Sequence, residues 1–247
     1  ADLPPHLVTQ VDRARLMQER LIMQAMSDIE IIVPATPESD ARPRAEALKA
    51  YVNQRYDEVL TSWAGATSSP FEQLMLLESA AYAGTAEQLP PLLESIRQDW
   101  PADACFASAQ FAAPDNSAKA AEHLLAGFKA LRQQVWTRLP FLQSALSLVP
   151  PLTAANPELA SLFFDALEQP FPGGMADVTR MSTLVEISPL LSEDRQLKLV
   201  SMFEPNPPWM QAFLEFRVKV YQRTSHCLLR QADQDLQAYL RHAKDGQ

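Results

Sequence analysis

The sequence predicts an all-α fold, an irregular multi-helix bundle of about nine or ten helices with a long first and a long last helix. The chain has 6 glycines and 20 prolines, whereas β-rich folds of this length use many glycines in hairpin turns and bulges. No stretch alternates apolar and polar residues over enough positions to require a strand. Apolar residues instead recur every three or four positions, in segments that end at proline.

The N-terminal part of the chain shows this pattern in two segments. A first helix is predicted from about Pro5 to Val33, where Pro34 stops it. After a polar linker, Asp40 is a plausible N-cap for a second helix that reaches Trp63, and Gly65 is suited to the left-handed residue that follows a helix.

The next helix start has a capping motif. Ser69 is expected at the N-cap, Pro70 at the first helical position and Glu72 at the third, which is a capping box. This helix is predicted to end at Gly84, and a shorter helix follows from Pro90 to about Trp100.

The middle of the chain combines one undecided segment with several predicted helices. Residues 101–116 are too rich in alanine for a strand and too interrupted for a regular helix. Residues 117–139 form the cleanest amphipathic pattern, which ends at Pro140. Further helices are predicted to start after the cap at Asn156 and to cover about 175–187 and 192–203.

The last predicted helix runs from Pro207 to about Lys244, because no glycine or proline interrupts it after Pro208. It would be roughly 55 Å long, which exceeds the diameter of about 45 Å expected for a compact domain of this size. Its apolar stripe moves to another face partway along. A bend or a change of packing partner is therefore expected near Thr224.

A single domain, 1–247, is expected, because 247 residues is near the upper limit for one hydrophobic core. Sub-divisions are possible near 101–116 or 150–156. No internal repeat of fixed period is found, so a regular solenoid is not predicted, although irregular helical hairpins stacked side by side remain an alternative.

Charge and motif content exclude several function classes. The net charge is −9, from 30 acidic and 21 basic residues, which argues against a general nucleic-acid binder. No run of apolar residues is long enough to predict a membrane span. Glycine-rich phosphate-binding motifs, a Gly-x-Ser-x-Gly motif and histidine patterns typical of metal sites are missing, so no metal, cofactor or catalytic residue is predicted and the balance is against an enzyme.

The two cysteines, Cys105 and Cys227, are candidates for a disulfide. Joining them would close a loop of about 120 residues, which the chain-entropy model values at roughly 5 kcal/mol. His226 does not activate its neighbour Cys227, because consecutive side chains on a helix diverge. Two unpaired core thiols, or a reactive Cys227 with a base from elsewhere in the fold, are the alternatives.

The predicted compartment is the periplasm or the extracellular space, and otherwise the cytoplasm. The start "ADLPPH" resembles what signal cleavage leaves after a small residue, and an even number of cysteines suits an oxidising compartment. Removal of an initiator methionine would give the same start.

The favoured function is a non-enzymatic protein-binding protein of the inhibitor, immunity or adaptor type, bacterial and exported, whose partner is another protein. Aromatic and methionine side chains are enriched at interface centres, and the predicted partner surface consists of Trp209, Met210, Phe213, Phe216 and Phe171. For Trp209 and Phe213, burial against the body of the protein is favoured over contact with a partner, as for most aromatic residues on helices. The sequence does not indicate an oligomeric state.

Two other functions are kept. One is a helical carrier of a hydrophobic small ligand, with a pocket near Phe163, Phe164, Leu167 and Met181, and the other is an enzyme that uses Cys227. An enclosed apolar cavity would favour the carrier, and a solid core with an exposed apolar patch would favour the protein partner.

Overall fold

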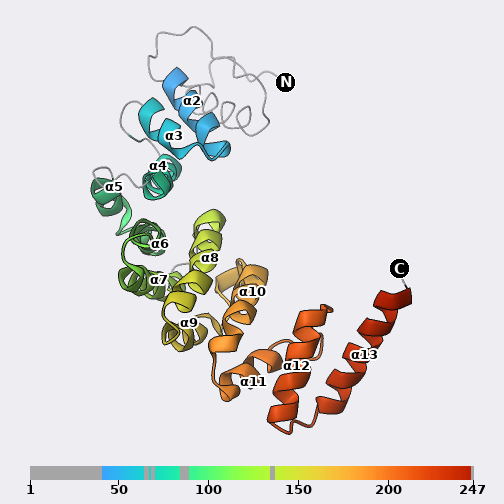
Figure 1. Ribbon diagram of the computed structural model, residues 1–247. Coiled ribbons are helices and arrows are strands. Elements are labelled where there is room, and N and C mark those ends of the chain that lie inside the picture. The colour runs from blue at the N-terminus through green and yellow to red at the C-terminus, as the bar shows by residue number, and fades with distance from the viewer. Residues whose placement is uncertain (1–40, 64–66, 68–69, 84–88, 134–136, 246–247) are drawn as a thin grey trace. The chain divides into compact units, whose positions relative to one another are not determined.

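The prediction of an all-α fold is confirmed for the residues that the computed structural model describes, which are 41–63, 67, 70–83, 89–133 and 137–245. Within these ranges the chain forms twelve α-helices, two short 3-10 helices and no strand (Figure 1). The predicted number of nine or ten helices is therefore too low. The long first helix predicted over 5–33 lies outside the described residues. The chain divides into two compact units, Ala1–Trp100 and Pro101–Gln247.

In the described part of the first unit, helices pack on their neighbours in sequence, α2 on α3, α3 on α4 and α4 on α5. Small and aliphatic side chains, among them Ala47, Val59 and Met75, form its core. The bounds are α2 Ala41–Val52, α3 Tyr56–Ser62, α4 Pro70–Ala83 and α5 Leu89–Ile96.

The segment predicted as one helix from Asp40 to Trp63 contains two helices, because the chain turns after α2. Gln54 has φ 57°, and the backbone N–H of Arg55 donates to the carbonyl oxygen of Ala50 at 2.9 Å. Together with the bond from Gln54 N–H to the carbonyl of Tyr51, this is a Schellman motif. The motif satisfies the last carbonyls of α2 without a glycine.

The second unit contains eight α-helices in the described part of the chain (Figure 1). Helix α6 packs on α7 and α8, α10 packs on α8 and α9, and α12 packs on both α11 and α13. The undecided segment 101–116 begins with the regular helix α6. The bounds are α6 Pro101–Ala112, α7 Ser117–Leu131, α8 Leu139–Ala155, α9 Leu159–Leu167, α10 Asp177–Ile187, α11 Glu193–Ser201, α12 Gln211–Arg223 and α13 Leu229–Asp245, with 3-10 helices η2 Pro172–Gly174 and η3 Ser188–Leu190.

The long last helix predicted from Pro207 to Lys244 is wrong, because α12 and α13 are separate helices that lie side by side as a hairpin (Figure 1). The turn between them begins at Thr224, where the sequence places the bend. Its physical basis is the shift of the apolar stripe. By folding back, α13 buries Ala232 completely in a cluster with Val220 and Tyr221 of α12 and Val200 of α11.

None of the helices within the described ranges combines the length and the apolar character that crossing a membrane requires.

Candidate docking groove

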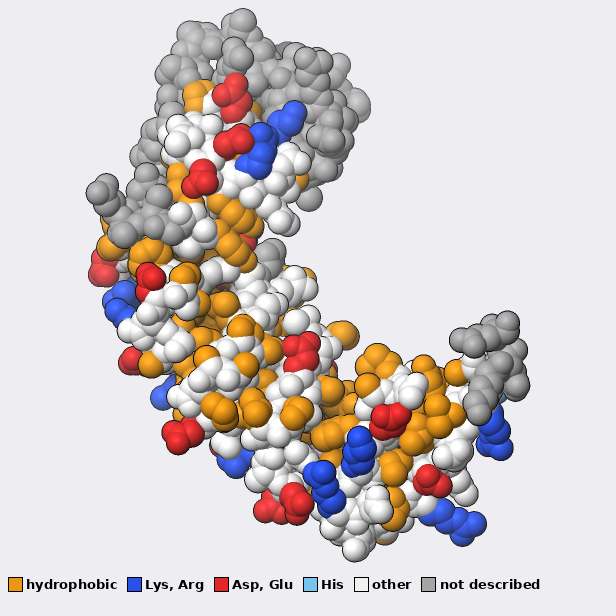
Figure 2. Space-filling model, in the orientation of Figure 1, with side chains coloured by type: hydrophobic (Ala, Val, Ile, Leu, Met, Phe, Trp, Pro, Cys, Tyr) orange, Lys and Arg blue, Asp and Glu red, His pale blue; other side chains and the backbone are white. Residues whose placement is uncertain are grey.

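The second unit contains an open groove of about 1110 Å³ between α10 and the segment that joins α11 to α12. Figure 2 shows hydrophobic side chains gathered around this hollow. The groove exists because α10 packs on α8 and α9 while α12 packs on α11 and α13. Each of the two helices therefore has a further face that is available to line it.

One wall of the groove is a second apolar face of α10. The inner face of this helix buries Leu184 and Ile187 in the core. Val178, Met181 and Val185 are spaced by three and four residues, so they share another face, and all three line the groove. The side chain of Val178 is 82% exposed and those of Met181 and Val185 are half-buried, so this face is only partly covered.

The opposite wall is formed by the α11–α12 segment and the start of α12. The rings of Phe203 and Phe213 meet edge to face with centroids 4.6 Å apart, and both line the groove together with Met210. Met210 is 58% exposed. Trp209 lies next to it in the chain, 50% exposed, with its ring 6.1 Å from that of Tyr239 on α13.

A buried ion-pair network fixes this second wall. The guanidinium of Arg217, whose side chain is 1% exposed, donates from Nε to Glu204 Oε1 at 2.7 Å and from Nη1 to Asp235 Oδ2 at 2.6 Å. The hydroxyl of Tyr221 donates to the same Glu204 oxygen at 2.7 Å. The network therefore connects the α11–α12 segment, which carries Glu204, to α12 and α13.

The network also shifts two pKa values. Burial, together with the hydrogen bond to Glu204, raises the pKa of Tyr221 to about 12. Burial lowers the pKa of Arg217, but its hydrogen bonds to Asp235 and Glu204 outweigh this effect and raise the pKa overall. Both groups therefore keep their protons at neutral pH, as the network requires.

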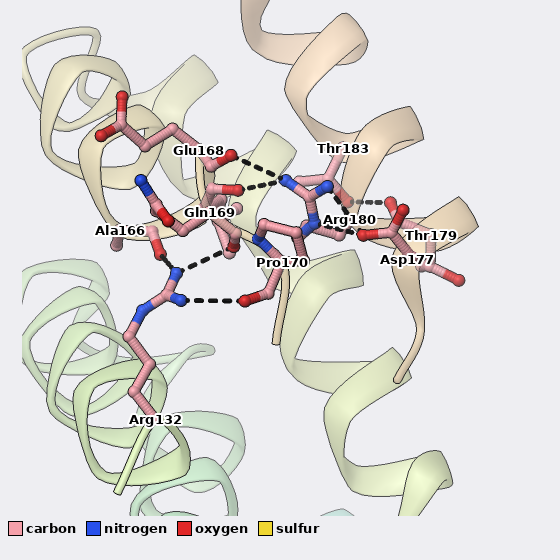
Figure 3. Close-up of polar contacts among 10 residues, drawn as sticks. Arg132, Ala166, Glu168, Gln169, Pro170, Asp177, Thr179, Arg180 and Thr183 are labelled. Carbon is pink, nitrogen blue, oxygen red and sulfur yellow. Dashed lines mark hydrogen bonds and ion pairs between the residues drawn. The ribbon is translucent and has the colours of Figure 1, made fainter. Parts of the chain in front are cut away.

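Two arginines hold the chain between α9 and α10, which borders the first wall (Figure 3). Arg132 donates to the carbonyl oxygens of Ala166, Gln169 and Pro170, at 2.6, 3.0 and 3.1 Å. Arg180 donates to the carbonyls of Leu167 and Glu168 and pairs with the carboxylate of Asp177, 2.8 Å from its Nε.

These bonds satisfy carbonyls that the C-terminus of α9 leaves without partners, and the positive charges favour the negative end of the helix dipole. Partial burial and the charge of nearby Arg180 lower the pKa of Arg132. Because Arg180 itself belongs to α10, the pair fixes α10 relative to α9.

The groove contains one acidic side chain without a counter-ion. Three of its carboxylates are paired, Glu168 with Lys198, Asp177 with Arg180 and Glu204 with Arg217. Glu186 is exposed, and among the described residues no ion pair or hydrogen bond engages its carboxylate. It is next to the last residue of α10, where a negative charge adds to the negative end of the helix dipole.

The structure separates the residues that the sequence assigns to a partner surface. Met210 lines the groove and is 58% exposed, and Trp209, next to it in the chain, is 50% exposed. Phe213 also lines the groove, but its side chain is 2% exposed, so it is buried against the body of the protein. Phe216 is half-buried and packs on the cluster at the α12–α13 hairpin. Phe171 is 2% exposed and stacks on Phe128 with centroids 5.7 Å apart, so it belongs to the interior rather than to this surface.

No disulfide joins Cys105 and Cys227 in the structure. Cys105 lies half-buried on α6, and Cys227 is exposed in the α12–α13 turn. The ring of His226 stacks on Tyr221 with centroids 4.3 Å apart, and its Nδ1 accepts the backbone N–H of Leu228 at 3.3 Å. Its Nδ1 is thus engaged with the backbone rather than with a cysteine. In the part of the chain that is described, no group of histidine, cysteine and acidic residues is arranged to hold a metal ion.

The pocket expected for a ligand carrier is filled by side chains. Phe163, Phe164 and Leu167 are all fully buried in the core. Of the four residues assigned to that pocket, only Met181 lines the groove. The groove is open to solvent, whereas a carrier encloses its ligand.

Sequence reasoning missed the α10 wall. The signal is present in "DVTRMSTLVEI", which carries one apolar pair at Leu184 and Ile187 and a second apolar set at Val178, Met181 and Val185. A short helix with two apolar faces buries one and leaves the other for a further contact.

No known protein family, curated protein or solved structure matches this chain.

Proposed function

We propose that the protein is a non-enzymatic binding protein, of the inhibitor, immunity or adaptor type, that receives an apolar segment of another protein in the groove between α10 and the α11–α12 segment. The observation that carries the proposal is the partly uncovered apolar face of α10 opposite Met210. Val178 is 82% and Met210 58% exposed on the two sides of one groove. Large apolar side chains that line a common hollow are typical of interaction sites, whereas single exposed ones are ordinary.

The energetics favour an occupant with apolar side chains. Each Å² of apolar surface removed from water contributes about 25 cal/mol, and the two walls offer aliphatic, thioether and aromatic groups together. Methionines such as Met181, Met202 and Met210 adapt their shape to different side chains. The groove is therefore suited to an apolar segment of a protein.

The charges select against an acidic occupant. The chain has a net charge of −9, and Glu186 lines the groove without a counter-ion among the described residues. A segment with a basic side chain would supply that counter-ion, whereas an acidic segment would be repelled.

The test is a comparison of Val178→Glu with Leu162→Glu. Leu162 is an exposed aliphatic residue on α9 of the same unit, 51% exposed and outside the groove. Both variants place one new carboxylate on an exposed helix surface, so both are expected to fold. The two variants and the original protein are used to capture proteins from the source organism, and each captured protein is then purified and its binding measured by calorimetry.

We expect a protein that binds the original chain and Leu162→Glu in a 1:1 ratio with equal affinity, and Val178→Glu at least tenfold more weakly, because a carboxylate would be buried against apolar groups. A partner that binds all three proteins equally would contradict the assignment of the groove. The absence of any such partner would overturn the proposed function.

A further inference from the structure

We infer that the occupant of the groove is an amphipathic α-helix of about nine residues that carries a lysine or arginine opposite Glu186; this inference rests on the proposed function. It specifies the conformation of the bound segment, its length and one position of its sequence. Four features of the groove support it.

The helical wall of the groove offers no backbone template for an extended segment. Peptides that bind as strands pair with the free N–H and C=O groups of a sheet edge. One wall of the groove is the helix α10, whose backbone bonds are formed within the helix, and no strand is present among the described residues. Recognition by the α10 wall therefore depends on side chains, as when an amphipathic helix packs into a groove.

The spacing of the apolar residues on α10 matches the surface of a second helix. Val178, Met181 and Val185 form a ridge with steps of three and four residues, and such ridges pack into the grooves of a neighbouring helix. The first and the last of them are seven residues apart, which corresponds to roughly 10 Å along the helix axis, or two turns. An occupant with apolar side chains at positions i, i+3 or i+4, and i+7 would follow this ridge.

The volume of the groove agrees with that length. A helix about 10 Å across that rises 1.5 Å per residue fills roughly 120 Å³ for each residue. A segment of about nine helical residues, or two and a half turns, is therefore of the same order of size as the groove of about 1110 Å³.

The position of the basic residue follows from Glu186. Glu186 lies near the C-terminal end of α10, one residue after Val185, and it lines the groove although its side chain points about 100° away from that of Val185. The negative end of the α10 dipole adds to its charge, so a cationic side chain at this end of the groove is attracted by both. A carboxylate on the occupant at that position would be repelled by Glu186 and by the negative end of the α10 dipole.

The experiment uses two libraries of displayed peptides, each about 15 residues long so that isolated helices can form. One library has randomised positions in an alanine-rich helical background. The other has the same randomised positions with a proline at the centre, which prevents a continuous helix. Both are selected on the full chain, and binders to Val178→Glu are removed.

We expect binders from the helical library alone, with apolar residues at i, i+3 or i+4, and i+7 and a lysine or arginine at one end. Selection of proline-containing peptides would overturn the inference that the occupant binds as an α-helix. Failure of both libraries would also overturn it. Neither result would affect the proposed function, which depends on the natural partner and its loss in Val178→Glu. Conversely, helical binders without any natural partner would contradict the proposed function alone.

The basic position is tested by exchanging charges. Glu186→Lys is expected to lower the affinity for the selected peptide at least threefold. The same variant is expected to bind a second form of the peptide, in which glutamate replaces the basic residue. Glu186→Lys is also expected to raise the melting temperature slightly, because a positive charge suits the C-terminus of α10. Weaker binding by a more stable protein cannot come from misfolding. Equal affinity of both peptides for both proteins would overturn the placement of the basic residue.

Discussion

The backbone N–H of His226 donates to the carbonyl oxygen of Tyr221 at 2.9 Å, across the turn that ends α12. The residue before His226, Ser225, has φ 50° and donates its own N–H to the carbonyl of Gln222. This is the same Schellman motif that ends α2 at Gln54. In both places a residue with a side chain occupies the left-handed position that glycine usually takes.

Ser225→Gly is expected to stabilise the protein by about 0.5–1 kcal/mol. A left-handed conformation costs a residue with a Cβ roughly 1–2 kcal/mol, and part of this gain is lost because glycine makes the unfolded chain more flexible. The measurement is the free energy of unfolding from urea titration. Ser225→Ala serves as the control, since it removes the hydroxyl but keeps the Cβ, and it should give no gain. Destabilisation by Ser225→Gly would contradict this account of the turn.

These two turns explain most of the difference between the predicted and the observed helices. Helix periodicity predicted the all-α fold, because apolar spacing depends on local sequence alone. The ends of α2 and α12 could not be read in the same way, since glutamine and serine at the left-handed position give no signal of a helix end. The shift of the apolar stripe near Thr224 was the only sign of the second turn, and it indicated a bend rather than a reversal.

The candidate site was predictable only on one side. Trp209, Met210 and Phe213 stand out in the sequence as aromatic and methionine residues at the start of a helix, and the structure brings the last two to the groove. The α10 wall was not found, because Val178 and Val185 look like ordinary core residues until the packing of α10 on α8 and α9 decides which face is covered. Phe171 shows the converse, since its position between two prolines predicts an exposed loop, yet its ring packs on Phe128.

Gly127→Ala is expected to destabilise the protein by about 1–3 kcal/mol, the usual cost of overpacking a core. Helix propensity alone predicts the opposite sign, since alanine is favoured over glycine by about 1 kcal/mol within a helix. A Cβ at Gly127 on α7 would lie 2.5 Å from Cε1 of Phe106 on α6 and 3.1 Å from Cβ of Cys105, and the Phe106 side chain is only 1% exposed.

The measurement is thermal unfolding of Gly127→Ala, Phe106→Leu and the double variant. If the clash is the cause, the cost of the alanine is smaller when leucine replaces the ring, so the two effects are not additive. An increase in melting temperature for Gly127→Ala alone would show that α6 and α7 are not packed so closely.

The stability of the protein is expected to fall between about pH 10 and 12 because of Tyr221. The pKa of this tyrosine is raised from its usual value of 10.0 to about 12 in the folded protein. Its contribution to stability is complete below the unfolded pKa of 10.0, and it is lost as the pH rises through about 12, since the unfolded chain releases the proton first. Urea titrations across this pH range measure the effect.

Tyr221→Phe should remove this pH-dependent part of the stability, and it should lower stability at neutral pH by about 1.5–3 kcal/mol because the hydrogen bond to the Glu204 carboxylate is lost. Tyr239→Phe, at a half-buried tyrosine outside the network, is the control and should leave the pH dependence in place. Identical pH profiles for Tyr221→Phe and the original protein would contradict the role assigned to Tyr221.

The two cysteines are expected to react at different rates with a thiol reagent. Cys227 is exposed in the turn between α12 and α13, so it should react rapidly in the folded protein, whereas Cys105 is half-buried on α6 and should react slowly. In denaturant both should react at once, giving two thiols per chain. Cys227→Ser should remove the rapid phase and leave the slow one.

A disulfide between Cys105 and Cys227, which the sequence proposes, would leave no reactive thiol in either condition until a reductant is added. Counting the reactive thiols of protein prepared under oxidising conditions therefore decides between two free thiols and a disulfide. Two cysteines that the fold holds apart cannot form a disulfide without movement of the backbone.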